Sequence, residues 1–554
     1  MPEATPGIGG AEQLISPSFV FGRRRGWASP RLPLRVFERA GIPVVAGICA
    51  VALLCLVVRF DVLPVLGSLV LCAVAVTVLL RPELATLAAV FLLYTNIPVL
   101  ATRYGLPKAA AAASMLLLAV PLLHHVIGRR EALRIDRTFR LMLVYLAILL
   151  VSSLGVRAPG VAAGYIGTFL MEGLALYLLI VNVVRSVSAL RRVIWVLLLA
   201  GSLLGALTIY QEATGSFHQQ FGGLAFRNDA SLTLQQAAAD PEAVEDMRSV
   251  APTKNPRAGG PVGETNRFAQ ILLVLLPLGV WLYRTAPTRL LQSCAAAAGL
   301  LMLGGIIFSD SRGAFVALIL TATVAVRMKW FSLRNVLTSA IALVLVVPLV
   351  APHYVERVVS IATAVDLARD VNSANEVDGA TRGRVTEMLA AWQAFLDHPV
   401  LGVGPGQYFP VYSVQYQNKD VRLKFRDLQT PRRAHSLYLE MAADVGIVGT
   451  AVFLLMFMGL MRALLHASRQ VAAGTSDAAD LAAALFLSLV AYAGTALFLH
   501  LAYVRYFWLL IALSSAALHA MSSRRPPVPA PVPTGTGTSS PRRRYGPASG
   551  RQGS

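Results

Sequence analysis

The chain has 554 residues, 56% of them hydrophobic and 14% charged, with a formal net charge of +20. A mean hydropathy of +0.62 excludes a soluble protein, because a soluble fold cannot bury that much apolar surface, and it predicts a polytopic membrane protein. The Lys and Arg residues fall mostly in short clusters between apolar stretches, which indicates membrane topology and excludes a nucleic-acid-binding surface.

The predicted elements are almost all membrane helices. Residues 1–40 are polar and rich in arginine, so we expect a disordered cytoplasmic segment followed by an uncleaved signal anchor near Gly41. About fourteen apolar stretches are each close to the ~20 residues that a helix needs to cross a bilayer. They begin near residues 41, 62, 84, 109, 141, 161, 193, 268, 290, 313, 336, 437, 481 and 506. The sequence therefore predicts an all-α fold, a polytopic transmembrane bundle of about 12–14 spans.

Basic residues orient this bundle. With a cytoplasmic N-terminus, the strongly basic short loops at 129–140, 185–192, 284–289, 327–334 and 462–469 all fall inside. The predicted domains are N-terminal transmembrane helices over 41–210, a first extracytoplasmic loop over 211–266, and transmembrane helices over 267–352. A large extracytoplasmic loop follows over 353–436, then C-terminal transmembrane helices over 437–523 and a disordered cytoplasmic tail over 524–554.

The large loop contains one predicted helix and one glycine-rich turn. From Arg384 to Asp397, apolar residues recur at helical spacing, which predicts an amphipathic helix on the membrane surface or across the mouth of the bundle. Its predicted apolar face comprises Val385, Met388, Leu389, Trp392, Phe395 and Leu396. Pro399 and the glycines that follow, Gly402 and Gly404, end this helix and turn the chain.

His435 is the leading candidate for catalysis. It stands where the large loop ends and the span near Leu437 begins, so the topology places it at the outer interface. An imidazole there is suited to take a proton from a sugar hydroxyl near neutral pH. The alternative is an interfacial histidine bonded to a carbonyl. Gly446 and Gly449, further along the span, have a spacing that lets another helix approach closely.

Several arginines are candidates for binding a phosphate, because a guanidinium group grips phosphate oxygens bidentately and keeps its charge. Arg312 is predicted at the outer end of a span, where the alternatives are snorkelling or a local pair with Asp310. Arg384 begins the predicted amphipathic helix, and Arg432 and Arg433 precede His435. For the last two, a solvated loop charge is the alternative, since the loop is generally basic.

Other polar residues have two interpretations each. Asn266 begins a span, where its amide is placed to contact a glycan or to cap the helix. Glu172, Glu440 and Asp444 lie within spans, either as functional acids or as buried partners of an arginine such as Arg505. The four cysteines lie in apolar stretches, and their spacing predicts neither a disulfide framework nor a metal site.

Four motifs from residue 266 to 449 carry a family resemblance. His435 and Ser436 are followed by Gly446 and Gly449 at the family's spacing, and HPVLGVGPGQY at 398–408 matches its loop motif. GRVTEMLAAW, which contains Arg384, and SDSRGAF, which contains Arg312, match two further segments. The chain thus resembles the O-antigen ligase family of ligase- and polymerase-like membrane glycosyltransferases.

The resemblance implies a GT-C-like bundle in the bacterial cytoplasmic membrane, with its active site on the extracytoplasmic face. In this family a glycan is transferred from polyprenyl pyrophosphate, usually undecaprenyl pyrophosphate, to an acceptor hydroxyl without metal or nucleotide. His435 would activate the acceptor, while Arg312 and Arg384, assisted by Arg433, would bind the pyrophosphate. The acceptor hydroxyl belongs to a glycan, a lipid or a protein, so a repeat-unit polymerase or a protein O-oligosaccharyltransferase is an alternative to a ligase.

A lipid-linked glycan flippase or other transporter is the alternative of another class. A transporter concentrates its key charges near the midplane, in broken helices or paired repeats. This chain has its candidate residues at the outer face and no evident repeat, which favours an enzyme.

Overall fold

The computed structural model describes residues 81–102, 108–228, 257–359, 379–419, 431–469, 476–501 and 504–522. The predicted terminal segments and the spans expected near Gly41 and Val62 lie outside these residues.

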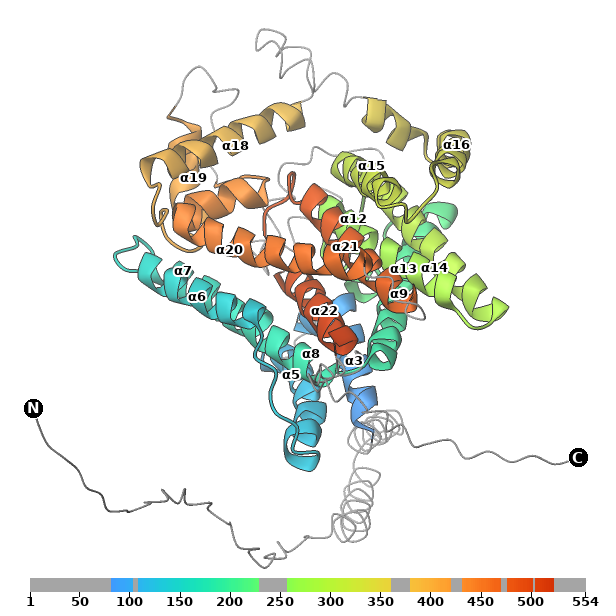
Figure 1. Ribbon diagram of the computed structural model, residues 1–554. Helices are drawn as coiled ribbons and strands as arrows, with labels where there is room; N and C mark the ends of the chain where they lie inside the picture. The colour runs from blue at the N-terminus through green and yellow to red at the C-terminus, as the bar shows by residue number, and fades with distance from the viewer. Residues whose placement is uncertain are drawn as a thin grey trace, which may run out of the picture. The chain divides into compact units, whose positions relative to one another are not determined.

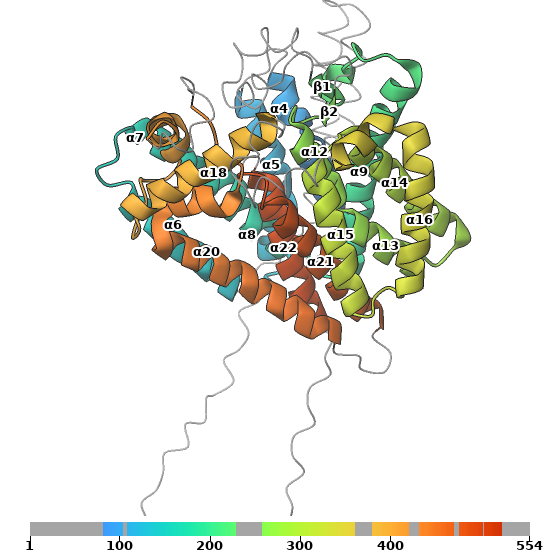
Figure 2. The same cartoon turned by 90° about the horizontal axis from the view of Figure 1, so that it is seen from above.

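The described chain is a helical bundle with one small β-ribbon (Figures 1 and 2). Its first part comprises α3 (Pro82–Thr95), α4 (Ile97–Thr102), α5 (Lys108–Leu123), α6 (Arg137–Ser152), α7 (Pro159–Thr168), α8 (Leu176–Val183) and α9 (Val187–Thr214), with π-helical turns at His124–Gly128 and Phe169–Ala175. A 3-10 turn at Phe221–Gly223 precedes β1 (Phe226–Asn228), which pairs antiparallel with β2 (Arg257–Gly260). The second part comprises α12 (Thr265–Leu273), α13 (Leu276–Thr285), α14 (Arg289–Phe308), α15 (Arg312–Arg327), α16 (Leu333–Val350), α18 (Gly379–Asp397), α19 (Ser413–Gln417), α20 (Leu437–Arg469), α21 (Ser476–Thr495) and α22 (Val504–Ser522), with a π-helical turn at Tyr408–Tyr412.

Eight helices in the described residues are long and apolar enough to cross a membrane. They are Pro159–Val183, Val187–Thr214, Thr265–Thr285, Arg289–Phe308, Leu333–Val350, Leu437–Arg469, Asp477–Thr495 and Val504–Ser522. Every span predicted to begin within the described residues coincides with a helix, although α3, with 14 residues, and α5, α6 and α15, with 16 residues each, are shorter than ~20. The all-α multi-pass fold is therefore confirmed.

The main core lies around α22, which is buried along almost its whole length. Its aromatic residues Phe507 and Trp508 meet Phe453 of α20. A helix that is apolar on all sides belongs in the interior of a bundle, and α22 is such a helix. Polar side chains begin several of the surrounding helices: Asp136 caps α6, Ser186 caps α9 and Ser311 caps α15.

A second, smaller core holds α18, α19 and the first turns of α20 together. The predicted helix after Arg384 is present as α18, and its side chains divide into a buried face and an exposed face. Ala390, Ala391 and Ala394 are buried, whereas Trp392 and Leu396 are exposed. Small residues let α18 lie close to α20, and the bulky apolar residues are left on the outer side of α18.

The predicted role of Gly446 needs a correction. Gly446 has φ 62° and ψ −167°, so it interrupts α20 rather than allowing another helix to approach. The interruption releases backbone groups, and the loop after α18 binds them. Val403 N donates to Ala443 O and Gly404 N to Asp444 O, while Ile447 N donates to Pro399 O. A Cβ on Gly446 would lie 2.3 Å from Val400 O, and one on Gly402 would lie as close to the Asp444 carbonyl carbon.

Gly449, one turn later, is the glycine that faces a neighbouring helix. A Cβ built there lies 3.6 Å from Ile148 of α6, and α6 packs along α20. This is an ordinary van der Waals distance, so the expectation that Gly449 lets another helix approach closely stays a prediction.

Candidate functional site

His435 lies immediately before α20, between a carboxylate and a second histidine. Its Nε2 is 3.5 Å from Oε2 of Glu387 on α18. Its ring stands edge-on to that of His500, which lies between α21 and α22, with ring centroids 6.1 Å apart. His435 has φ 46°, a conformation that non-glycine residues adopt sparingly and mostly at turns or functional sites.

Burial keeps both histidines neutral at physiological pH. Desolvation, reinforced by the positive charge of Arg384, lowers the pKa of His435 to about 3. Burial also lowers the pKa of His500, with a further contribution from Arg433. In the His435 tautomer with its proton on Nε2, directed at Glu387, the lone pair lies on Nδ1. This arrangement is suited to accept a proton.

Glu387 is a candidate site residue that the sequence did not single out. Its side chain is only 2% exposed, and its Oε1 lies 3.3 Å from Arg432 Nη1. A carboxylate behind an imidazole fixes the ring's orientation and stabilises the imidazolium formed on proton transfer. The available signal was its place within the GRVTEMLAAW motif, three residues after Arg384.

The interpretation of Arg432 and Arg433 as solvated loop charges is wrong. Arg432 pairs with Glu387, and Arg433 Nη1 lies 2.9 Å from Glu440 Oε1 and stacks over Phe409. Glu440 Oε2 also accepts from Ala434 N, so this acid fixes the two residues before His435. Glu440 and Asp444 are thus structural partners, as Asp444 accepts from Tyr408 N. In the bundle core, Glu172 pairs with Arg505 at 3.0 Å, which confirms the alternative given for that acid.

Arg312 begins α15 at the end of a turn that two other residues hold. Arg257 of β2 donates through Nη2 to Ser309 O at 2.9 Å and to Asp310 O at 3.1 Å. Ser311 Oγ donates to Asn266 Oδ1 at 2.9 Å. Asn266 therefore does not cap α12; Glu264 does, by accepting from the backbone N–H of residues 266 and 267.

Arg384 connects these two groups of residues. Arg384 lies on α18, three residues before Glu387, and its charge lowers the pKa of both His435 and Arg257. Burial, followed by the charges of Arg357 and Arg384, lowers the pKa of Arg257 to about 9, and burial raises the pKa of Asp310. Arg257 and Arg357 are further basic residues that the sequence did not single out.

Arg267 ties the inner side of the site to the bundle. Its Nη2 donates to His500 O at 2.7 Å, and its side chain is almost fully buried. Gln270, one turn later, donates to Thr495 Oγ1, and Leu437 N donates to Ala496 O. The ends of α12, α20 and α21 thereby meet around the two histidines.

The assembled site contains two neutral histidines and more guanidinium groups than carboxylates. Such a site suits an anionic substrate whose negative charge grows during the reaction. Among the described residues there is no cluster of His, Cys, Asp and Glu that would hold a metal ion.

Residues 297–454 match the family model described as O-antigen ligase. This match covers Arg312, Arg384, Arg433 and His435, while Asn266 and Arg257 precede it. A search of curated proteins found no match to the chain.

Proposed function

The chain carries an O-antigen ligase domain over residues 297–454, and on that premise we propose that it transfers a glycan from a polyprenyl pyrophosphate to an acceptor hydroxyl. The match supports a membrane glycosyltransferase or ligase that acts in polysaccharide biosynthesis. The proposed donor is undecaprenyl-pyrophosphate-linked, and the proposed location is the extracytoplasmic face of the bacterial cytoplasmic membrane. The single observation that carries the proposal is the position of His435, whose Nε2 lies 3.5 Å from Glu387 on α18, the helix that also carries Arg384.

In the proposed reaction, the acceptor oxygen bonds to the anomeric carbon of the donor glycan. The bond from that carbon to the pyrophosphate oxygen breaks, and the pyrophosphate leaves with the electron pair. Nδ1 of His435 takes the acceptor proton, and Glu387 stabilises the resulting imidazolium. Arg312 and Arg384 face the growing negative charge, and Arg433, positioned by Glu440, adds to the field. Asn266, bonded to Ser311, is placed to contact the glycan.

Bound donor also strengthens the base. The charge of Arg384 disfavours protonated His435 in the free protein. A pyrophosphate beside Arg384 compensates that charge, so the pKa of His435 rises once donor is bound. The basicity of His435 is thus coupled to the presence of the donor.

The decisive experiment is a reconstituted transfer assay. Purified protein in nanodiscs is given a labelled undecaprenyl-pyrophosphate glycan and candidate acceptors, with and without a chelator. We expect label on the acceptor, free undecaprenyl pyrophosphate in equal amount, and no effect of the chelator. Movement of intact donor across a vesicle bilayer without glycan transfer would instead identify a flippase.

A deletion strain separates ligase from polymerase. Loss of a ligase leaves long glycan chains on the carrier lipid, whereas loss of a polymerase leaves single repeat units. Sizing of lipid-linked and surface glycans reads out both outcomes, and loss of glycan from a surface protein would indicate the protein O-oligosaccharyltransferase. We propose the ligase, with the other two as alternatives on the same donor chemistry.

A further inference from the structure

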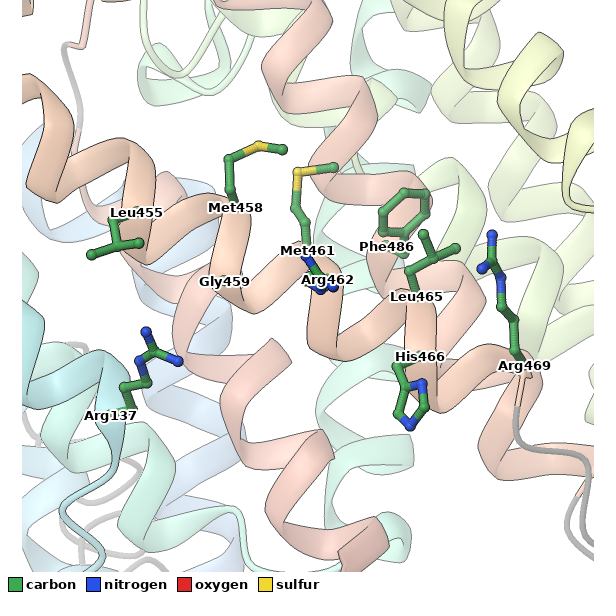
Figure 3. Close-up of a pocket in the computed structure, with 10 residues that line it drawn as sticks. All are labelled: Arg137, Leu455, Met458, Gly459, Met461, Arg462, Leu465, His466, Arg469 and Phe486. Carbon is green, nitrogen blue, oxygen red and sulfur yellow. The ribbon is translucent and has the colours of Figure 1, made fainter.

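A groove of about 920 Å³ lies between the second half of α20 and the beginning of α6 (Figure 3). Arg462, His466 and Arg469 of α20 line one part of it, and Arg137 of α6 reaches toward α20 from the opposite wall. Leu455 and Met458 line the part nearer the middle of α20. The volume is at the upper end of the ~300–1,000 Å³ typical of small-molecule sites.

Polarity changes along the groove. At 1.5 Å per residue, the helix rises about 21 Å from Leu455 to Arg469. Leu455 is 51% and Met458 58% exposed, so the apolar part faces the membrane. The basic part lies at the end of α20 opposite His435. The groove therefore has the dimensions and polarity of an amphiphile, with an apolar body and an anionic head.

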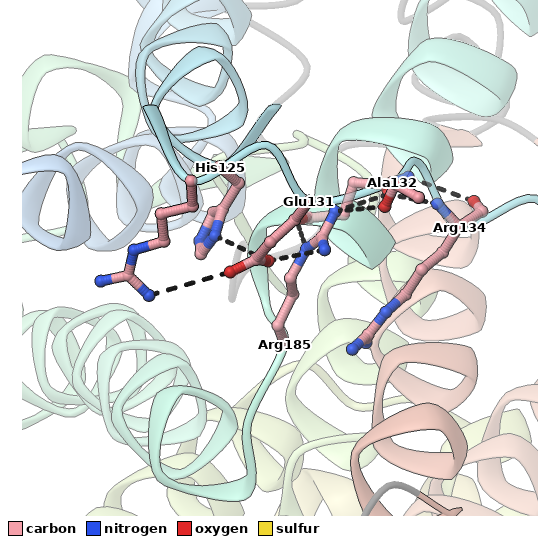
Figure 4. A network of polar contacts seen from close by, with 7 residues as sticks. His125, Glu131, Ala132, Arg134 and Arg185 are labelled. Atoms are coloured by element: carbon pink, nitrogen blue, oxygen red, sulfur yellow. Dashed lines mark hydrogen bonds and ion pairs between the residues drawn. The ribbon is translucent and has the colours of Figure 1, made fainter. Parts of the chain in front are cut away.

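Other arginines at the same end of the bundle form ion pairs with carboxylates. There, Arg185 pairs with Glu131 at 2.7 Å in a network that includes His125 (Figure 4). Arg191 pairs with Asp477 at 2.7 Å and Arg284 with Asp480 at 3.7 Å.

The groove arginines have no such compensation. Among the residues that the structure describes, Arg137, Arg462 and Arg469 make no ion pair with a carboxylate. Three guanidinium groups around one groove thus carry uncompensated positive charge, and guanidinium is the side chain best suited to bind phosphate oxygens.

We propose that this groove binds an anionic glycerophospholipid from the leaflet at this end of the bundle, cytoplasmic in the predicted topology. Its phosphate would lie at Arg462 and Arg469, with Arg137 on the opposite wall nearer Leu455, and its acyl chains along Leu455 and Met458. Basic sites between helices on this side of a membrane favour anionic headgroups. A zwitterionic lipid brings its own cation, which lies against the arginines, so the groove selects for net negative charge.

The test measures lipid retained by the full-length protein. Protein purified in mild detergent is incubated with equal amounts of phosphatidylglycerol and phosphatidylcholine, and bound lipid is counted by native mass spectrometry. We expect preferential retention of phosphatidylglycerol. The double variant Arg462→Gln with Arg469→Gln weakens that retention about 25-fold, because each arginine near an anionic lipid contributes about fivefold.

A matched control removes the same charge elsewhere. Arg289 and Arg334 are exposed residues at the beginnings of α14 and α16, outside the groove. The double variant Arg289→Gln with Arg334→Gln should retain phosphatidylglycerol as the unmodified protein does. Equal retention of the two lipids, or equal losses in the two double variants, would overturn the proposal.

A photocrosslinker identifies the occupant directly. With p-benzoylphenylalanine in place of Met458, we expect an adduct with the mass of one phospholipid after illumination in native membranes. Crosslinks to residues 41–80 of the same chain, or to a second copy, would show that protein covers the groove and would overturn the assignment.

Discussion

The two parts of α20 on either side of Gly446 share one helix but have different surroundings. In the first part, residues 440–446 are all buried, including Glu440 and Asp444. In the second part, apolar residues such as Ile447, Leu455 and Met458 are exposed, as expected for a helix that faces lipid. One part therefore belongs to a polar site and the other to the membrane.

The interruption at Gly446 is what allows this difference. A continuous helix satisfies its own backbone and leaves no groups for a neighbouring loop. The broken helix instead exchanges hydrogen bonds with residues 399–404, which anchors the loop after α18 onto the beginning of α20. Because α18 carries Arg384 and Glu387, the break fixes both residues relative to His435.

The largest expected effect is that of removing the base. His435→Ala should lower transfer by ~10²–10⁴-fold, the usual contribution of a positioned general base. His435→Asn is its companion, since Asn tolerates the left-handed backbone at this position. Turnover in nanodiscs and thermal unfolding are measured together.

The control is His398→Ala, because His398 belongs to the same polar stretch but is exposed. It should keep transfer within a few-fold of the unmodified protein. If His435→Ala folds and transfers glycan at the normal rate, His435 is not the general base.

Next in size is Glu387→Gln, which keeps the shape and removes the charge behind the imidazole. We expect kcat to fall on the order of 10²-fold with little change in KM, because the imidazolium forms only as the reaction proceeds. In a protein that already carries His435→Asn, Glu387→Gln should lower kcat very little further. The exposed Glu356→Gln serves as control. An additive loss in the double variant would show that Glu387 acts on something other than His435.

Two glycines test the division of α20 itself. At Gly446 both φ and ψ lie in a region open essentially to glycine, and a Cβ would clash with Val400 O. Gly446→Ala should lower the free energy of unfolding by about 1–3 kcal/mol and reduce transfer, as the loop loses its anchor. Gly459→Ala, in the second part, meets nothing within 4 Å and should change stability by less than ~1 kcal/mol. Equal melting temperatures for the two variants would contradict the division.

The sequence predicted the helices and the three candidate residues His435, Arg312 and Arg384. It did not predict which residues position these three. His435, Arg312 and Arg384 stand in recognisable local motifs, so periodicity, charge and spacing reveal them. Glu387 lies on the alanine face of α18, whereas the apolar pattern that predicts the helix follows the opposite face, with Trp392 and Leu396. Packing decided the face, since only small residues fit against α20.

Contacts between residues that are far apart in the chain could not be predicted from the sequence either. Arg257 holds a turn 52 residues later, and no local pattern links the two. The break at Gly446 depends on hydrogen bonds to residues more than 40 positions earlier, so its glycine spacing was attributed to helix packing. The ion pair of Arg433 with Glu440 joins residues only seven positions apart. It was not predicted because the loop before His435 contains many basic residues, which made Arg433 look like one more solvated charge.

A smaller effect separates charge from geometry at Arg312. Arg312→Lys keeps the positive charge but loses the planar fork, so we expect a loss of about tenfold in kcat/KM. Arg327→Lys, at the other end of α15, is the control and should leave kcat/KM unchanged. Measuring kcat/KM over a range of donor concentrations distinguishes the two. Full activity in Arg312→Lys would mean that Arg312 contributes only its charge.

The pH dependence should show the smallest change, and its sign follows from the lowered pKa of His435. The unfolded histidine titrates near 6.5 and the folded one near 3, so between these values the unfolded chain binds a proton that the folded protein does not. Stability from this residue is thus present above pH 6.5 and is lost as pH falls toward 3. The acid limb of kcat/KM, which reports the free protein, should lie well below 6.5. Since bound pyrophosphate offsets Arg384, the acid limb of kcat should lie at higher pH than that of kcat/KM. Profiles measured from about pH 3 to 8 test this order, and a reversed order would show that bound donor does not offset the charge of Arg384.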